Sequence, residues 1–228
     1  MKIISPSVEV WTPIEGGLQR IERCARVCWK SEERSDGTPE GAEQFLRSLL
    51  RRGHESVFEH MSVTAKFTVD RGVSHEIVRH RLAAYCQEST RYCNYTGGRF
   101  GREITVIKPC FWEEGSREYE EWKTVCKEAE RTYIALVKAG ATPQEARSVL
   151  PNSLKTELVM TANIREWRHF LKLRTARDAH PQMQEAAGMA LEKLKKAVPL
   201  LFDDIHAEAC IGDDACDITK LLEKGRDE

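Results

Sequence analysis

Twice along this chain the periodicity changes from that of a strand to that of a helix at a side chain that caps helices. The first change follows residues 60–69, HMSVTAKFTV, where β-branched and aromatic residues alternate as in a half-buried strand. Asp70 is then placed as the N-cap of a helix over residues 70–85, DRGVSHEIVRHRLAAY. This helix would carry the RHR triplet at residues 79–81 in its closing turns.

The second change lies between residues 153–162, SLKTELVMTA, and residues 163–174, NIREWRHFLKLR. The first stretch is predicted to be a strand, and Asn163 can cap the helix that follows. Trp167 and Phe170 recur at helical spacing and would be buried on one face of that helix. The chain is therefore expected to have an α/β (α+β) fold, because strands and helices both recur along it.

The other elements follow from the same signals. Residues 2–10 are a possible strand that Pro6 would break or confine to an edge. Residues 103–109 hold a short strand, and residues 112–140 a long charged helix that ends at Gly140. The remaining helices are expected at 18–28 and 42–50, joined by the charged loop 31–41, at 142–150 behind the cap Thr142, and at 182–201.

Length and charge narrow the class of protein. The chain has 228 residues, and about 150 residues per domain is only a soft prior, so residues 1–218 are expected to form one domain and 219–228 a flexible tail. With 35 basic and 36 acidic residues, the net charge of -1 lacks the positive field of a protein that coats nucleic acid. Any anion site must therefore be local.

The sequence contains no recognisable targeting signal and no CxxC pair. No basic segment followed by an apolar run opens the sequence, and no apolar stretch approaches about 18 residues, so a cytoplasmic protein without a membrane segment is expected. The 8 cysteines include no CxxC pair, which favours reduced thiols.

Arginine is concentrated in one segment. Between residues 79 and 102 there are five arginines against a single interior acid, Glu88. Arginine stays charged and presents a rigid fork of donors, so such clustering indicates an anion nearby. Alternatively, cations in the last turn of a helix only complement its negative end. Three consecutive helical residues also point about 100° apart, so the triplet would need ligands or neighbouring chains on several sides.

Other chemistries find less support. His54 and His60 in HESVFEH have the wrong spacing for HExxH, and no zinc-ribbon cysteine pair occurs, so no metal site is predicted. GGRFG at residues 97–101 lacks the GxGxxG spacing, and no P-loop is present, so side chains must meet any phosphate. A cysteine nucleophile stays open, with Cys86 inside the basic segment.

Four ordered motifs carry a family resemblance. The RHR triplet is followed after seven residues by Ser89, and this spacing resembles the signature of the flavin-dependent thymidylate synthases. HESVFEH (54–60), ARSVLP (146–151) and NIREWRHFLKLR (163–174) resemble further elements of that family in the right order, and AHPQMQEAA follows as its usual next segment. Many members carry other residues at the positions of Ala84 and Cys86, and some members do so at the position of Glu76.

The resemblance implies a fold and an activity. The fold would be a central, mostly antiparallel sheet flanked by long helices, in a single catalytic domain. The chain would be a homotetramer with FAD in sites shared between subunits. It would convert dUMP to dTMP with 5,10-methylenetetrahydrofolate as carbon donor and NADPH as reductant.

The resemblance also assigns residues to ligands. Those expected to contact or position FAD are His54, Ser56, Glu59, Arg79, His80, Arg81, Gln87, Asn163, Arg165 and His169. Those expected around dUMP are Glu76, Arg79, Gln87, Glu88, Ser89, Thr90, Arg91, Arg147 and Arg174. Arg174 is the expected catalytic residue at the uracil ring. Ser89 is expected to position dUMP, since no base adjoins its hydroxyl to make it a nucleophile.

A second hypothesis of another class is a non-catalytic nucleotide- or RNA-binding protein that uses the same arginine cluster for phosphates. Binding that depends steeply on salt, without flavin or turnover, would favour it.

Overall fold

The computed structural model describes residues 1–12 and 16–207, and a four-stranded antiparallel sheet forms its centre. Its strands are ordered β2 (Ser7–Val10), β3 (Ser62–Asp70), β6 (Lys155–Asn163) and β4 (Ala83–Gln87). A separate parallel pair joins β1 (Lys2–Ile4) to β5 (Thr105–Ile107). The expectation of an α/β (α+β) chain with a mostly antiparallel sheet is confirmed.

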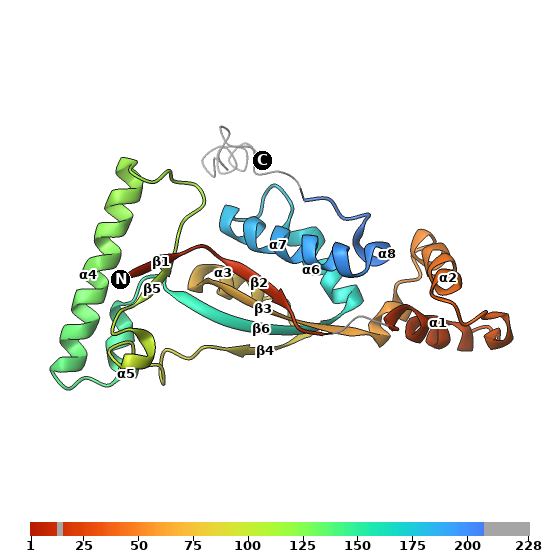
Figure 1. Ribbon diagram of the computed structural model, residues 1–228, viewed down its shortest axis with the longest axis horizontal. Coiled ribbons are helices and arrows are strands. Elements are labelled where there is room, and N and C mark those ends of the chain that lie inside the picture. Colours follow the sequence, from red (N-terminus) through yellow and green to blue (C-terminus); the bar gives the residue numbers. More distant parts are fainter. Residues whose placement is uncertain (13–15, 208–228) are drawn as a thin grey trace, which may run out of the picture.

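Helices lie over the sheet and at both ends of the molecule (Figure 1). In the described residues they are α1 (Gly17–Val27), α2 (Pro39–Arg51), α3 (Arg71–Ile77), α4 (Arg117–Lys138), α5 (Pro143–Ala146), α6 (Ile164–Arg174), α7 (Pro181–Ala197) and α8 (Pro199–Phe202). Four short 3₁₀ segments lie at Glu32–Arg34, Ser56–His60, Gly98–Phe100 and Arg147–Val149. Helices α6 and α7 pack on the sheet, α4 lies against β1 and β5, and α1 with α2 form the opposite end.

The register of β3 and β6 places two helix caps at opposite ends of the sheet. Ser62 pairs with Asn163, and Asp70 pairs with Lys155. Asp70 accepts a hydrogen bond from Val73 N at 2.7 Å and so starts α3 at one end. Asn163 accepts one from Glu166 N at 2.8 Å and starts α6 at the other. Both capping predictions are confirmed.

Trp167 of α6 belongs to the larger apolar cluster, to which α7 and the sheet also contribute. Its side chain is fully buried, and its indole nitrogen donates to the carbonyl of Val63 at 3.0 Å. The Phe67 ring stacks on it with centroids 6.2 Å apart, and the Phe170 ring meets it edge-on at 5.6 Å. Helix α6 is therefore fixed to β3 by one polar and several apolar contacts.

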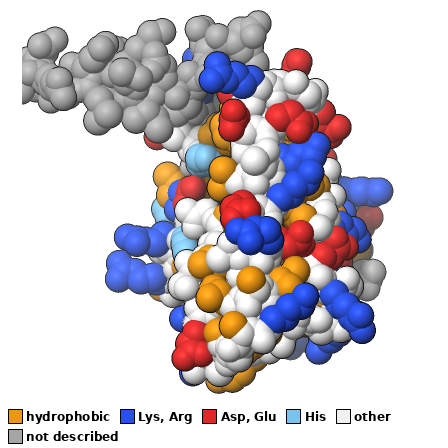
Figure 2. All heavy atoms as spheres, turned by 90° about the vertical axis from the view of Figure 1, so that its left-hand side faces the viewer, with side chains coloured by type: hydrophobic (Ala, Val, Ile, Leu, Met, Phe, Trp, Pro, Cys, Tyr) orange, Lys and Arg blue, Asp and Glu red, His pale blue; other side chains and the backbone are white. Residues whose placement is uncertain are grey.

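A second apolar cluster lies under α4, where Tyr133 and Ile104 are fully buried. The outer face of this end carries basic and acidic side chains interspersed with apolar ones (Figure 2). An exposed Arg131–Glu128 ion pair on α4 is one example of this mixing. This face therefore offers no extended surface of one charge sign.

The predicted helix over residues 70–85 is wrong beyond Ile77. Helix α3 ends there, and residues 83–87 instead form β4, the edge strand that pairs with β6. The single proton of the Tyr85 hydroxyl is shared between the carbonyls of Ile77 (2.9 Å) and His80 (2.6 Å), which lie at the end of the helix. Burial raises the pKa of Tyr85 to about 12, so it remains a donor.

Proline explains two other interruptions. Residues 2–10 form two strands, β1 and β2, because Pro6 cannot donate a ladder hydrogen bond. The helix expected over 182–201 stops at Ala197, and α8 follows it, because Val198 precedes a proline and adopts a non-helical φ of -146°.

The domain division stays a prediction, and the proposed boundary at residues 218 and 219 lies outside the described residues. Within the described residues, no helix is long and apolar enough to cross a membrane.

Candidate active site

The register of β4 on β6 brings the RHR segment to the start of α6. Ala83 pairs with Ala162, one residue before the cap Asn163. Residues 79–82 therefore lie against the first turns of α6, although some eighty positions separate them in the chain. His80 is buried and turned toward α6, whereas Arg79 and Arg81 are exposed.

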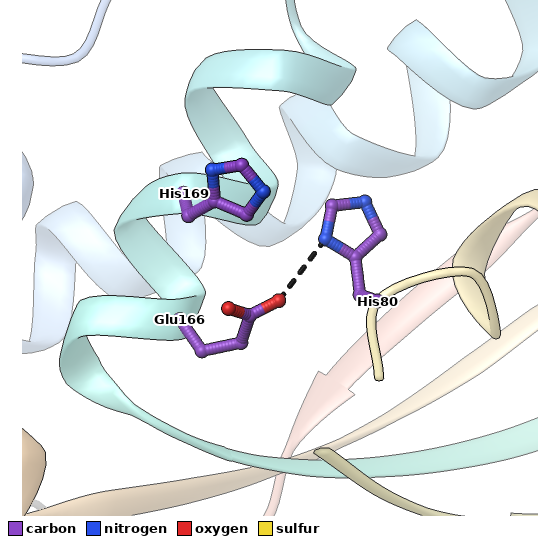
Figure 3. Close-up of side chains that lie close together, drawn as sticks. All are labelled: His80, Glu166 and His169. Atoms are coloured by element: carbon purple, nitrogen blue, oxygen red, sulfur yellow. Dashed lines mark hydrogen bonds and ion pairs between the residues drawn. The ribbon is translucent and has the colours of Figure 1, made fainter. Parts of the chain in front are cut away.

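A chain of hydrogen bonds links His80 to three other side chains. His80 Nδ1 lies 3.1 Å from Glu166 Oε1, and Arg174 Nε donates to His80 Nε2 at 3.1 Å. Arg174 also donates through Nη1 to Glu76 Oε2 at 3.0 Å and through Nη2 to the Glu76 carbonyl at 3.1 Å. Figure 3 shows that Glu166 and His169 approach His80 from α6. The guanidinium is thus fixed by three contacts in different directions.

The surroundings of His80 favour its neutral form. Burial is the largest cause that lowers its pKa below the ordinary 6.5, the hydrogen bond to Glu166 opposes this, and the Arg174 charge acts with burial. The Phe170 ring packs edge-on at 4.9 Å, and the His169 ring lies 5.4 Å away. A neutral ring is also what the Arg174 contact requires, because a guanidinium can only donate.

Two neighbouring hollows meet at this cluster. The Arg174 hollow, of about 540 Å³, is lined by Arg79, His80, Arg81, Leu82, Glu166, His169, Leu173 and Arg174. The Arg165 hollow, of about 910 Å³, is lined by Glu55, Glu59, Leu82, Asn163, Arg165, Glu166, Arg168, His169 and Lys172. Leu82, Glu166 and His169 line both. Seven residues expected at FAD therefore surround adjoining spaces in one chain.

The Arg147 hollow, of about 450 Å³, lies beyond the other end of β4. Its lining includes Thr90, Arg147 and Arg71. Arg147 Nη1 donates to Thr90 Oγ1 at 3.4 Å, and Arg71 Nη1 is buried without a hydrogen-bond partner among the described residues. Two guanidinium groups and a hydroxyl are a donor set that suits a phosphate.

The segment between β4 and this hollow is tightly connected. Glu88 accepts from Tyr95 Oη at 3.0 Å and pairs with Lys155 Nζ at 2.6 Å. The Gln87 amide donates to Ser74 Oγ at 2.9 Å. Ser89 Oγ accepts from the backbone N–H of Arg91 at 3.3 Å, so Ser89, Thr90 and Arg91 form one turn beside the Arg147 hollow.

Seven of the predicted residues line none of these hollows: His54, Ser56, Glu76, Gln87, Glu88, Ser89 and Arg91. His54 and Ser56 are exposed near the end of α2 and in the 3₁₀ segment that follows. A larger hollow, of about 1040 Å³, lies between α1 and residues 32–37 and contains none of the predicted residues. Although this hollow is larger, the Arg174 hollow is the better candidate active site, because ionisable side chains that are hydrogen-bonded to one another line it.

His80, Glu166 and His169 are also the group, among the described residues, that has ligand atoms close enough to hold a metal, within 4.8 Å of one another. However, the Arg174 cation contacts the second ring nitrogen of His80. A ligating histidine normally donates from that nitrogen, so this arrangement favours a hydrogen-bond network over a divalent cation.

Sequence reasoning missed Glu166 and Arg71. Glu166 precedes His169 by three residues and so shares its helix face, a signal that could have been used. Arg71 carries no such signal, because only the pairing of β3 with β6 brings it to Arg147. Burial raises the pKa of the Cys126 thiol to about 11 and that of Cys93 in the same direction, which disfavours both as nucleophiles.

Comparisons by sequence match this chain to thymidylate synthases. Residues 9–200 match the family model described as thymidylate synthase complementing protein. A flavin-dependent thymidylate synthase from Mycobacterium sp. (strain JLS) is 32% identical over 224 residues, which covers 89% of this chain and 85% of that protein. One from Geobacter sulfurreducens (strain ATCC 51573 / DSM 12127 / PCA) is 34% identical over 189 residues, covering 81% and 80%.

A solved structure extends the likeness to three dimensions. The UMP/dUMP methylase PolB from Streptomyces cacaoi, bound with 5-Br dUMP, matches with a TM-score of 0.73 and 25% identity over 89% of this chain and 96% of that chain. The family match includes β3, β4 and β6 of the central sheet and every motif that carried the resemblance. This chain therefore belongs to the enzyme family of flavin-dependent thymidylate synthases.

Proposed function

We propose that this chain catalyses the reductive methylation of dUMP to dTMP in the cytoplasm. The net reaction transfers a one-carbon unit from 5,10-methylenetetrahydrofolate to dUMP, takes a hydride from NADPH and a proton from solvent, and releases tetrahydrofolate and NADP⁺. The observation that carries the proposal is the Arg174 guanidinium, held by His80 and Glu76 at the edge of an arginine-lined hollow.

The donor set of the Arg147 hollow supports dUMP as the substrate. The PolB structure contains a dUMP analogue, and a nucleotide monophosphate needs several fixed cations when no glycine-rich loop is present. Arg71 Nη1, which lies beside Arg147 and has no hydrogen-bond partner in residues 1–12 and 16–207, meets that need. We assign the phosphate to Arg71, Arg147 and Thr90, with the Ser89–Arg91 turn beside them.

The residues around Arg165 and Arg79 suit FAD. Its pyrophosphate is anionic, and Arg79, Arg81, Arg165 and Lys172 supply cations around the two adjoining hollows. When bound, the flavin supplies the hydride that reduces the transferred carbon. Asn163, His169 and Glu166 contribute hydrogen-bonding groups on the same walls.

Arg174 would stabilise negative charge on the uracil ring. Activating the ring for attack on the methylene group places charge on its N3 and O4 atoms, and a fixed guanidinium lowers that cost without reorganising. Because His80 and Glu76 already hold Arg174, the cation is oriented before substrate binds.

The separation of the hollows supports a homotetramer with shared sites. β4 lies between the Arg174 and Arg147 hollows, and its five residues alone extend on the order of 15 Å. Leu82 is 75% exposed and Tyr92 is 78% exposed beside these regions. Apolar groups exposed next to a polar site are typical of surfaces that another subunit covers.

Replacing Ser89 by alanine should keep most dTMP formation and mainly raise the KM for dUMP, because its hydroxyl accepts from the Arg91 backbone and has no neighbouring base within the part of the chain that the structure describes. Steady-state rates over a range of dUMP concentrations test this. Complete loss of kcat with normal dUMP binding would instead assign Ser89 a covalent role.

The function itself is tested by the visible spectrum of the purified protein. Bound FAD should give a yellow protein, NADPH should bleach it, and dTMP should form when dUMP and methylenetetrahydrofolate are both added. Omitting either substrate is the control. A protein that cannot be reconstituted with FAD and binds RNA with steep salt dependence would contradict the proposal and favour a nucleic-acid-binding role.

A further inference from the structure

The contact between Arg174 and His80 defines the protonation of the histidine ring. Arg174 Nε lies 3.1 Å from His80 Nε2. A guanidinium has donors and no acceptor, so Nε2 must present its lone pair. The ring proton must then be on Nδ1, which faces Glu166 Oε1 at 3.1 Å.

The Glu166 carboxylate is positioned to accept a hydrogen bond from that Nδ1–H group. The residue is 6% exposed, and its backbone N–H is held by the cap Asn163. Its carboxylate lies on the wall common to the Arg165 and Arg174 hollows. None of the four sequence motifs assigned it a role.

We propose that Glu166 is a positioning residue: its carboxylate holds His80 as the Nδ1–H tautomer, so that Nε2 can accept from Arg174 and orient the guanidinium. This inference rests on the proposed function only for the role of Arg174 in turnover. The order of contacts is Glu166, His80, Arg174 and then Glu76.

The alternative tautomer shows why an acceptor is needed. A proton on His80 Nε2 would face the Arg174 N–H across 3.1 Å, and two donors cannot share that distance as a hydrogen bond. Arg174 would then be oriented by Glu76 alone. Doubly protonated His80 has the same defect, with an added repulsion between cations.

The charged groups around His80 fix the direction of its pH response. Helix α6 contributes Glu166, His169 and Arg174. Helix α3 contributes Glu76, which acts on His80 by way of its bond to Arg174. The segment that contains His80 itself contributes Arg79 and Arg81. The pKa of His80 is lowered, so the neutral ring and its contact with Arg174 are present above pH 6.5 and are lost as pH falls through the lowered pKa.

The test compares Glu166→Leu with Glu166→Gln. Leucine removes the acceptor, whereas the glutamine carbonyl keeps one. We expect kcat for dTMP formation to fall by roughly tenfold or more in Glu166→Leu, with the KM for dUMP changing less, and to be largely recovered in Glu166→Gln. Glu128→Gln, which breaks an exposed ion pair on α4, is the control for loss of a carboxylate.

Two readouts separate positioning from simple packing. In ¹⁵N-histidine spectra, His80 should carry its proton on Nδ1 in the parent and Glu166→Gln proteins and should populate both tautomers in Glu166→Leu. The acid limb of kcat/KM should shift to lower pH in Glu166→Gln, because the carboxylate that raises the pKa is gone.

A proton found on His80 Nε2 in the parent protein would overturn the inference, as would equal kcat in Glu166→Leu and the parent or an equal loss in both variants. The tautomer is measured without turnover. An inactive parent with Nδ1–H on His80 would therefore refute the proposed function and leave this inference standing.

Discussion

Replacing Arg174 by alanine is expected to reduce kcat for dTMP formation by about two to three orders of magnitude while FAD stays bound. That range is typical of removing one preorganised donor from an active site. The side chain lies between His80 and Glu76, so alanine removes the cation and leaves both partners without a donor. Single-turnover rates and the ratio of flavin to protein absorbance measure the two effects separately.

The lysine variant sharpens this prediction. Arg174 donates in three directions, to His80 Nε2, the Glu76 carboxylate and the Glu76 carbonyl, and a single ammonium cannot reproduce that fork. Arg174→Lys should therefore restore little of the lost rate. Turnover close to that of the parent in either variant would contradict a role for Arg174 in the reaction.

Replacing Trp167 by alanine is expected to lower the free energy of unfolding by about 3–5 kcal/mol. The indole is fully buried against Phe67 and Phe170, and its N–H bonds to the Val63 carbonyl. Urea denaturation at fixed protein concentration measures the change. Trp167→Phe should lose less, because an aromatic ring remains in the cluster and only the N–H and part of the ring volume are lost.

Trp29 is the matched control for that experiment. Its side chain is 87% exposed at the end of α1, so Trp29→Ala should change the free energy of unfolding by no more than about 0.5 kcal/mol. Similar destabilisation in the two alanine variants would mean that the larger apolar cluster does not depend on Trp167.

Local signals sufficed for the elements whose structure is decided by nearby residues. Asn163 caps α6 and Asp70 caps α3, because each cap bonds a backbone N–H three residues ahead. The same reasoning failed at residues 78–85, where the predicted helix is replaced by a turn and the first residues of β4. There the pairing with β6 and the bonds of Tyr85 outweigh local preference, and neither can be read from neighbouring residues.

The candidate site was predictable to the extent that its motifs are contiguous. The RHR triplet and the motif that ends in Arg174 were recognised from their sequences. The contact between these two motifs could not be predicted from either sequence. Glu166 meets His80, and Arg71 lies beside Arg147, only because β3, β6 and β4 align in one register. Sequence letters define the residue types, and strand pairing selects the partners.

The position of β4 also has a consequence for biosynthesis. Its strand partner β6 follows it only after α4 and α5 have been made, so a chain emerging from the ribosome displays the RHR triplet long before it can be anchored. Such distant pairings form late and slowly. A fragment that stops before Lys155 would contain all three residues of the triplet and lack both the strand and the helix that orient His80.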